Sequence, residues 1–292
     1  MKIANKNATF YIYIAINLLS VAALFMVPFS WSMVALFAVN YFLGMFFITA
    51  GYHRYFSHRS FKLNRFWQFF FAFMCMSSGQ KGVLWWAANH RDHHLHSDEE
   101  DDLHSPVQHG FWHAHMGWIF EPKSQTYNPK KITDFSKYPE LVWLNKYYWV
   151  PALSMGAFIG LLGLYITGTL APLVWGYFFT LFCLYQASYT INSLAHVYGS
   201  RRFDTTDDSR NNFFLAIITL GEGWHNNHHH CKSSCRQGYK WYEIDFTYYM
   251  LVMLSWIGIV KDIRPFRAEN TRGVVVEAKP KTETQPEIIE VA

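Results

Sequence analysis

Four long apolar segments restrict the folds open to this sequence. They cover residues 10–27, 31–51, 149–167 and 173–191. Each has about the 17–25 residues that a helix requires to cross a bilayer. Short turns at residues 28–30 and 168–172 join them into two hairpins. The composition agrees, because 51% hydrophobic, 19% aromatic and only 16% charged residues are too apolar a mixture for an ordinary soluble domain.

The distribution of positive charge predicts the orientation of these hairpins. Neither turn contains Lys or Arg, whereas residues 52–147 contain many. By the positive-inside rule, both termini and the segment between the hairpins face the cytoplasm. We therefore expect an all-α integral membrane protein with four transmembrane helices and a cytosolic helical cap.

The remaining segments complete the expected domain organisation. The membrane domain covers residues 1–267, with the cap formed by residues 52–147 and 192–267. Two shorter apolar segments, 66–79 and 246–260, are expected to be buried or interfacial rather than spanning. Residues 268–292 lack a hydrophobic pattern and are expected to form a disordered tail.

Histidine is unusually frequent, with 15 residues, and it is clustered. The candidate ligands are His53 and His58; His90, His93 and His94; Asn192 and His196; and His225, His228 and His229. Histidines at i, i+3 and i+4 share one helix face, within about 100°. His53 and His58 would stand about 140° apart on an ideal helix, so they reach one site only at a frayed helix end, or else bind different metals.

These clusters predict a centre with two metal ions. The predicted topology places all of them on one side of the membrane, and nine imidazoles exceed the capacity of one ion. The four cysteines, Cys75, Cys183, Cys231 and Cys235, lack metal-ligand spacing, which disfavours a structural zinc site or an iron–sulfur cluster. An all-imidazole set suits iron, copper or zinc.

The other histidines are weaker candidates. We interpret His109, His113 and His230 as bystanders. For His96, His104 and His115, an outer role behind the ligands and plain polar contacts both stay open.

The histidine clusters also carry a family resemblance. The segments HRYFSH at residues 53–58, HRDHH at 90–94 and GEGWHNNHH at 221–229 resemble the three histidine boxes of the membrane fatty-acid desaturases. NSLAHVYG at residues 192–199 resembles a further metal-binding segment of the stearoyl-CoA (acyl-CoA Δ9) branch. The resemblance covers residues 11–267, is closest to the short bacterial forms, and implies a bacterial inner membrane.

The resemblance implies a non-haem di-iron (Fe2+) oxidoreductase that inserts a cis double bond into a saturated acyl chain, using O2 and two electrons. By analogy, one iron would be held by His53, His58, His90, His94 and His228. The other would be held by His93, His196, His225 and His229, with Asn192 acting through a water molecule. Zinc would be an inactive substitute in overproduced protein. No catalytic residue is expected beyond these ligands.

The expected substrate is a stearoyl or palmitoyl acyl-CoA. Trp85, Trp86, Trp118 and Trp224 are candidates to line its tunnel, although interfacial tryptophans are expected in any membrane protein. Gly44 and Met45 are candidates to plug the end of the tunnel. Ala88, Asn89 and Arg202 depart from the pattern of the branch, which leaves acyl-CoA against acyl-lipid substrates open.

The same sequence features and family resemblance suggest the remaining partners and the alternative functions. We expect membrane lipid around the spans, no nucleic acid, and a separate electron donor, either a ferredoxin or a small haem cytochrome with its reductase. The alternatives are an acyl-lipid desaturase or fatty-acyl hydroxylase on the same scaffold and, more remotely, a metal transporter. A transporter would place histidines deep within its spans, and none lies there.

Overall fold

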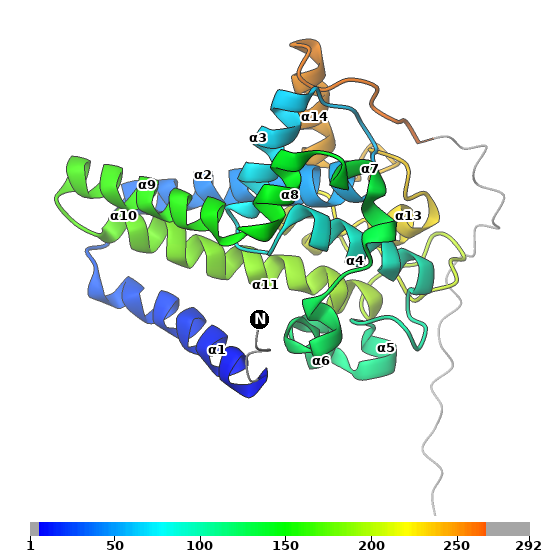
Figure 1. The fold of residues 1–292 in the computed structure, drawn as a ribbon, viewed down its shortest axis with the longest axis horizontal. Helices are drawn as coiled ribbons and strands as arrows, with labels where there is room; N and C mark the ends of the chain where they lie inside the picture. Colours follow the sequence, from blue (N-terminus) through cyan, green and yellow to red (C-terminus); the bar gives the residue numbers. More distant parts are fainter. Residues whose placement is uncertain (1–5, 267–292) are drawn as a thin grey trace, which may run out of the picture.

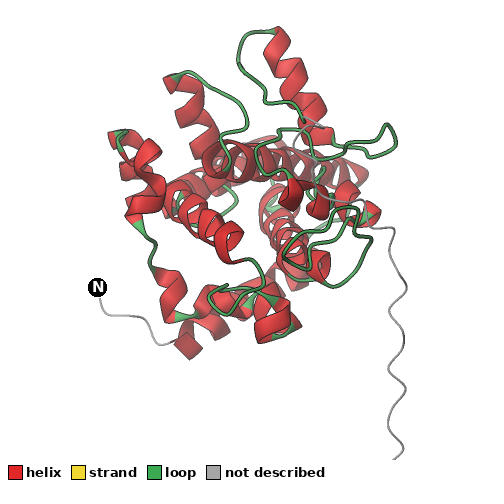
Figure 2. Ribbon diagram, turned by 90° about the vertical axis from the view of Figure 1, so that its right-hand side faces the viewer, coloured by secondary structure: helices red, strands yellow, loops and turns green. Residues whose placement is uncertain are grey.

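The computed structural model describes residues 6–266, and within this range it is helical, with only isolated β-bridges (Figures 1 and 2). The tail expected at residues 268–292 lies outside the described range. The first hairpin consists of α1 (Lys6–Ala22), the 3₁₀ turn η1 (Ala23–Met26), α2 (Trp31–Phe47) and its π-helical continuation η2 (Ile48–Ser57). The second consists of α9 (Trp149–Thr167), α10 (Ala171–Leu173), the π-helix η6 (Val174–Phe179) and α11 (Thr180–Asn192).

The cap is built from short helices before and after the second hairpin. Before it come α3 (Arg65–Met76), α4 (Val83–His96), α5 (Pro106–His109), α6 (Phe111–His115), η3 (Gly117–Phe120), η4 (Pro122–Gln125), η5 (Pro129–Ile132), α7 (Thr133–Ser136) and α8 (Pro139–Lys146). After it come η7 (Leu194–His196), α12 (Phe213–Ile218), α13 (His225–His230) and α14 (Phe246–Trp256). Asn64, Asn212 and Asp245 begin α3, α12 and α14, because each side chain accepts a hydrogen bond from a free backbone N–H of the first turn.

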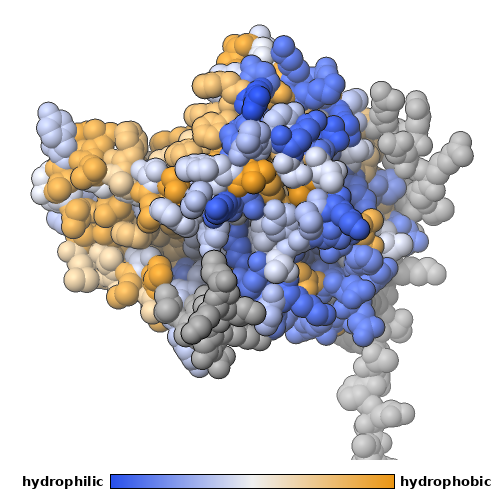
Figure 3. Space-filling model, in the orientation of Figure 1, coloured by the Kyte–Doolittle hydropathy of each residue, from blue (hydrophilic) through white to orange (hydrophobic). Residues whose placement is uncertain are grey.

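The two ends of the molecule differ in surface chemistry. The end formed by the long helices is apolar, and the cap is hydrophilic (Figure 3). Phe25, Trp31 and Tyr165 are 88%, 78% and 89% exposed there. Exposed apolar side chains in such numbers are typical of a surface that contacts lipid. By length and composition, two helices can cross a membrane, Trp31–Ser57 and Trp149–Thr167. The four-span topology stays a prediction.

Small residues allow the long helices to approach closely. A Cβ atom on Gly163 of α9 would lie 2.8 Å from Cγ of Pro172 in α10. Glycine at such a contact lets two helix backbones pack directly, as in membrane helix pairs. The second hairpin is therefore held tightly at its turn.

The two shorter apolar segments form helices of 12 residues (α3) and 11 residues (α14). At 1.5 Å per residue, each is only about 17–18 Å long, well short of the roughly 30 Å hydrocarbon layer. Both project from the cap (Figure 1), with Phe66 and Trp256 largely exposed. Their place at the membrane interface stays a prediction.

Candidate metal centre

A π-helix brings the first two histidines together. In η2, the backbone N–H of His58 donates to the carbonyl of His53, five residues earlier, at 3.2 Å. This i→i+5 bonding places residues five apart on the same side of the helix. The Nε2 atoms of His53 and His58 lie 3.2 Å apart. The expected frayed helix end is therefore wrong: the second long helix continues to Ser57, and its widened turn aligns the pair.

Two facing helices supply most of the remaining histidines, in a reciprocal arrangement. On α4, His90 and His94 join the group of His53, whereas His93 joins a second group. On α13, the i, i+4 pair His225 and His229 belongs to the second group, and the histidine between them belongs to the first. Each helix thus divides one i, i+3, i+4 set between two sites.

The first site, which we call the five-histidine group, contains His53, His58, His90, His94 and His228. Its Nε2 atoms form a closed ring. The successive separations are 3.2 Å for His53–His58, 2.9 Å for His58–His90, 3.0 Å for His90–His94, 3.0 Å for His94–His228 and 3.0 Å for His228–His53.

Hydrogen bonds cannot satisfy this ring. A neutral imidazole Nε2 carries either one proton or one lone pair, so donors and acceptors would have to alternate, which five members do not allow. Five lone pairs directed at one central cation remove the conflict. Imidazole nitrogens bind metals at about 2.0–2.1 Å, and neighbours at a right angle would then lie about 3 Å apart. The residues therefore fit a metal ion.

The second site, the four-histidine group, contains His93, His196, His225 and His229. All four are buried, and their candidate ligand atoms lie within 4.8 Å of one another. The Nε2 atoms of His196 and His225 are 3.0 Å apart. Nε2 of His229 is buried and has no hydrogen-bond partner among the described residues. An orphaned buried acceptor of this kind is costly unless a ligand occupies it, so this group also fits a metal ion.

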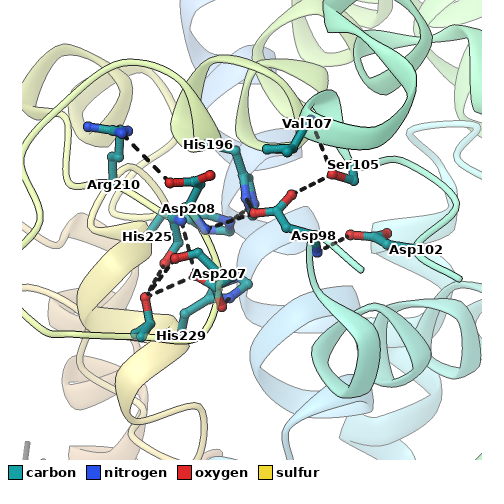
Figure 4. A network of polar contacts seen from close by, with 12 residues as sticks. Asp98, Asp102, Ser105, Val107, His196, Asp207, Asp208, Arg210, His225 and His229 are labelled. Atoms are coloured by element: carbon teal, nitrogen blue, oxygen red, sulfur yellow. Dashed lines mark hydrogen bonds and ion pairs between the residues drawn. The ribbon is translucent and has the colours of Figure 1, made fainter. Parts of the chain in front are cut away.

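Carboxylates hold several of these rings from behind. In the four-histidine group, Nδ1 of His93 lies 2.9 Å from Asp102. Nδ1 of His196 lies 2.8 Å from Asp98, and Nδ1 of His229 lies 2.6 Å from Asp207 (Figure 4). In the five-histidine group, Nδ1 of His53 lies 2.5 Å from Glu222. A carboxylate on Nδ1 fixes the proton there and leaves Nε2 free to bind a metal.

Burial and neighbouring carboxylates together set the charge state of these histidines. Against the effect of burial, Asp102 raises the pKa of His93. Burial lowers the pKa of His90, His94, His225 and His228 well below the usual value, because the charged imidazolium is poorly solvated. The pKa of His229 falls to about 4 for the same reason, against the opposing effect of Asp207. Burial alone would raise the pKa of Asp98, but its hydrogen bond to His196 holds it at about 2. Neutral imidazoles beside ionised carboxylates are the forms that metal binding requires.

Two cavities meet at the centre. The lining of the larger, about 260 Å³, includes Lys81, Tyr148, His90 and Asn192. The lining of the smaller, about 60 Å³, includes Met45, His53, His93 and His225. Trp86, His90, Ser188 and Asn192 line both.

The four candidate tunnel tryptophans differ in whether they line a cavity. Trp85, Trp86 and Trp118 line the larger cavity. Trp224 lines neither of these two cavities, and its indole N–H donates to the carbonyl of Ile244, 2.8 Å away. A place for Trp224 in the substrate tunnel stays a prediction.

The weaker candidates have structural partners. His109 and His113 contact the carbonyls of Asp102 and Leu103 at 3.0 and 3.1 Å, and His230 stacks on Phe203. His115 lies between Ser193 and Gln186. His96 lies 3.4 Å from the carboxylate of Glu99 at the surface. His104 is different, because it lies behind His93, near Asp102, in a third cluster that sequence reasoning did not identify.

Known proteins resemble this chain over most of its length. A family model of fatty acid desaturases matches residues 29–252. An acyl-CoA 5-desaturase of Anemone leveillei is 34% identical over 268 residues, which cover 90% of this chain and 82% of that protein. An sn-1 stearoyl-lipid 9-desaturase of Anabaena variabilis is 35% identical over 238 residues, 81% of this chain and 85% of that protein. A probable chloroplastic lipid desaturase of Arabidopsis thaliana is 36% identical over 256 residues, 87% of this chain and 69% of that protein.

Proposed function

This chain belongs to the fatty acid desaturase family, and on that premise we propose that it is an O2-dependent acyl-CoA Δ9-desaturase of the stearoyl and palmitoyl class. The observation that carries the proposal is the larger cavity, whose lining includes both a cationic side chain, Lys81, and a candidate ligand, His90. Its tryptophan and tyrosine walls suit an acyl chain. Its cationic side chain suits the phosphates of coenzyme A.

The proposed reaction removes two hydrogen atoms from adjacent methylene groups of the acyl chain. The acyl chain gains one cis double bond. The two hydrogen atoms removed from it, O2, two electrons from a donor and two protons form two water molecules. Two iron ions bound by the histidine groups would supply the activation of O2, since no side chain can abstract hydrogen from an unactivated methylene. Zinc in the same positions would be inactive, because it has no redox chemistry.

The protein's own contribution is to position the acyl chain and to exclude water. Trp85, Trp86 and Trp118 would hold the acyl chain beside the histidines and keep water away from it. Asn192 faces the place where the two cavities meet and would hold a water molecule there. Met45 lines the smaller cavity and would limit how far the chain reaches beyond the centre. Gly44 does not line it; a Cβ there would meet Leu184.

The membrane arrangement is part of the proposal. The two hairpins would form four spans and place both termini and the histidine groups on the cytoplasmic side. The membrane would be a bacterial inner membrane. Electrons would come from a separate donor, a ferredoxin or a small haem cytochrome with its reductase. The basic segment between the hairpins suits an acidic donor.

A product assay tests this function. Purified iron-loaded protein in lipid nanodiscs, with a ferredoxin and its reductase, is given stearoyl-CoA and O2, and products are analysed by mass spectrometry after derivatisation of the double bond. We expect cis-9 octadecenoyl-CoA. A hydroxylated acyl chain, or a double bond at another position, would overturn the assignment.

A second candidate is an acyl-lipid desaturase. It is favoured by relatives such as the sn-1 stearoyl-lipid 9-desaturase of Anabaena variabilis. The same assay, with the stearoyl chain presented only within phospholipid, separates the two. Turnover of the lipid without turnover of stearoyl-CoA would select this candidate.

A further inference from the structure

The two histidine groups differ in the charge that surrounds them. Three of the four rings in the four-histidine group are backed by a carboxylate, from Asp98, Asp102 and Asp207. Among the described residues, no Lys or Arg side chain pairs with any of these three carboxylates. A cation at this site would therefore face three carboxylates, of which, within the described range, only Asp207 lies near enough to a basic side chain, Lys232, to interact with it electrostatically.

The five-histidine group has less negative charge behind it. Only His53 is backed by a carboxylate within the described range, and that residue, Glu222, also pairs with the guanidinium of Arg54, whose Nε lies 3.2 Å away. A further cation lies close by, because the Lys232 ammonium donates to the backbone carbonyl of His94 at 2.9 Å. The charge around this site is thus nearly balanced before a metal binds.

The four-histidine group is also held more rigidly. Asp98 accepts hydrogen bonds from the Ser105 hydroxyl at 2.6 Å and the Asp208 backbone N–H at 2.8 Å (Figure 4). Asp102 in turn accepts from the backbone N–H of Asp98 at 3.0 Å. This network fixes the rings before any metal arrives, which reduces the ordering that binding requires.

Solvent access differs in the same direction. All four members of the four-histidine group are buried, whereas His58, His90 and His94 are half-buried. A chelator or water molecule therefore reaches the five-histidine group more easily. The fifth imidazole there favours binding, but it is neutral, and each outer carboxylate is worth about 10–100-fold in metal affinity.

From these differences, which presuppose the dinuclear centre proposed above, we propose that the four-histidine group binds its metal more tightly, so that a chain with one metal holds it there. Asp98, Asp102 and Asp207 are the positioning residues responsible. The five-histidine group is filled last and emptied first. Partial loss of metal would then leave a single, characteristic half-occupied form.

Stepwise removal of metal from the full-length protein tests the order. Zn2+ serves as the probe because it does not change oxidation state. Protein with two Zn2+ is dialysed against increasing EDTA, and metal per chain is measured by mass spectrometry. We expect two steps, with the second at a concentration at least about tenfold higher. Release of both ions in one step would overturn the proposal.

Two variants on one helix show which site is emptied first. His225 and His228 both lie on α13, both are buried, and neither Nδ1 has a partner among the described residues, yet they belong to different groups. After the first step, His228→Ala should retain about one Zn2+ per chain and His225→Ala none. The reverse pattern, or equal loss in both, would contradict the proposal.

A measurement on unaltered protein covers the case in which a variant does not fold. Crystals of the wild type after the first step, with diffraction recorded at the zinc edge, should show one anomalous peak within the four-histidine group. A peak within the five-histidine group would refute the order directly.

The role of the carboxylates has its own test. Asp207→Asn should shift the second release step to about 10–100-fold lower EDTA, whereas Glu222→Gln should leave it in place. With one Co2+ bound, the visible d–d bands should move in Asp207→Asn alone, which a purely structural role would not produce. An unchanged second step in Asp207→Asn would show that charge is not the cause. None of these measurements uses substrate. Failure of the proposed reaction would therefore leave the order of metal release standing, and a different order of release would leave the proposed reaction standing.

Discussion

At the scale of single residues, Arg54 links the metal centre to the C-terminal part of the cap. Its guanidinium is 1% exposed. Nη2 lies 2.9 Å from Asp245, Nε 3.2 Å from Glu222, and Nη1 donates to the Cys235 carbonyl at 2.7 Å. Since Glu222 also contacts His53, this one side chain joins α14, the segment before α13 and a candidate ligand.

Replacement of Arg54 should therefore be severe. Arg54→Met leaves two buried carboxylates without their cation, a change that typically costs about 3–5 kcal/mol. Arg65→Met is the matched control, because Arg65 also forms two hydrogen bonds to one carboxylate, Glu140, but its side chain is 65% exposed. We expect a large drop in the thermal unfolding midpoint for the first variant and little change in the midpoint for the second, because solvent screens an exposed ion pair. Equal midpoints would contradict the role of burial.

Lys81, in the wall of the larger cavity, predicts a pH dependence of substrate binding. Burial lowers its pKa to about 8, because the ammonium is poorly solvated beside Trp85. As pH rises through this value, the side chain loses its charge, and its attraction for a phosphate is lost.

The KM for stearoyl-CoA should therefore rise between pH 7 and 9, by roughly two- to fivefold for one screened charge pair. Lys81→Arg stays protonated throughout this range and should remove the rise. Steady-state kinetics across the range decide the matter. A wild-type KM that does not change with pH would show that Lys81 does not meet the substrate's charge.

At this scale, local spacing identified the candidate ligands but not the residues that support them. The i, i+3, i+4 spacing of His90, His93 and His94 on one helix was the signal. Asp207 and Glu222 have no such signal, because each meets its histidine through the tertiary fold. The acidic residues after α4 were visible as a cluster, but no local rule connects Asp98 to His196, 98 residues away.

At the scale of elements, packing at the turn of the second hairpin makes a specific prediction. Gly163 and Gly160 lie on the same helix, α9, so substitution by Val changes the helix propensity equally at both. A side chain on Gly163 collides with the Pro172 ring, whereas on Gly160 it meets the mobile end of Leu173 at 3.3 Å. Gly163→Val should cost about 1–3 kcal/mol more, seen as a lower unfolding midpoint in detergent. If Gly160→Val proves equally harmful, close approach at Gly163 is not the reason.

The π-helix η2 is a feature that the α-helical periodicity of the sequence did not predict. Hydropathy identified the second long helix, since apolar length is a property of the sequence. The α-helical period then placed His53 and His58 on different faces, and only the extra residue per hydrogen-bonded turn reconciles them. Five-residue spacing between two ligands was itself the available signal for a π segment.

At the scale of the whole molecule, the proposed topology places the two hairpin turns opposite the cap. Phe29 and Leu170 are exposed in these turns, and Glu100 is exposed on the cap. Three of the native cysteines are buried and Cys183 is half-buried, so wild-type protein provides the background.

A membrane-impermeant maleimide should therefore label Phe29→Cys and Leu170→Cys in intact spheroplasts. Glu100→Cys should react only after the membrane is opened. Labelling of Glu100→Cys in intact spheroplasts would place the cap on the other side and refute the orientation.

The overall architecture was partly accessible from sequence, because apolar length and charge bias act through the membrane itself. Two helices meet the length and apolarity required of a span. The fourth apolar segment continues as one helix through α10, η6 and α11, and a hydropathy pattern does not reveal its π-helical stretch, η6. The division of nine histidines between two sites depends on how α4 and α13 face each other, a property of the packed fold rather than of either segment.

The central claim is that these histidines hold two metal ions, one in each group. Anomalous diffraction at the iron edge, from crystals of protein loaded with Fe2+ under anaerobic conditions, tests it most directly. We predict two peaks, one enclosed by the Nε2 ring of the five-histidine group and one within the four-histidine group, each about 2.1 Å from its nitrogens. A single peak, or iron bound away from both groups, would contradict the account.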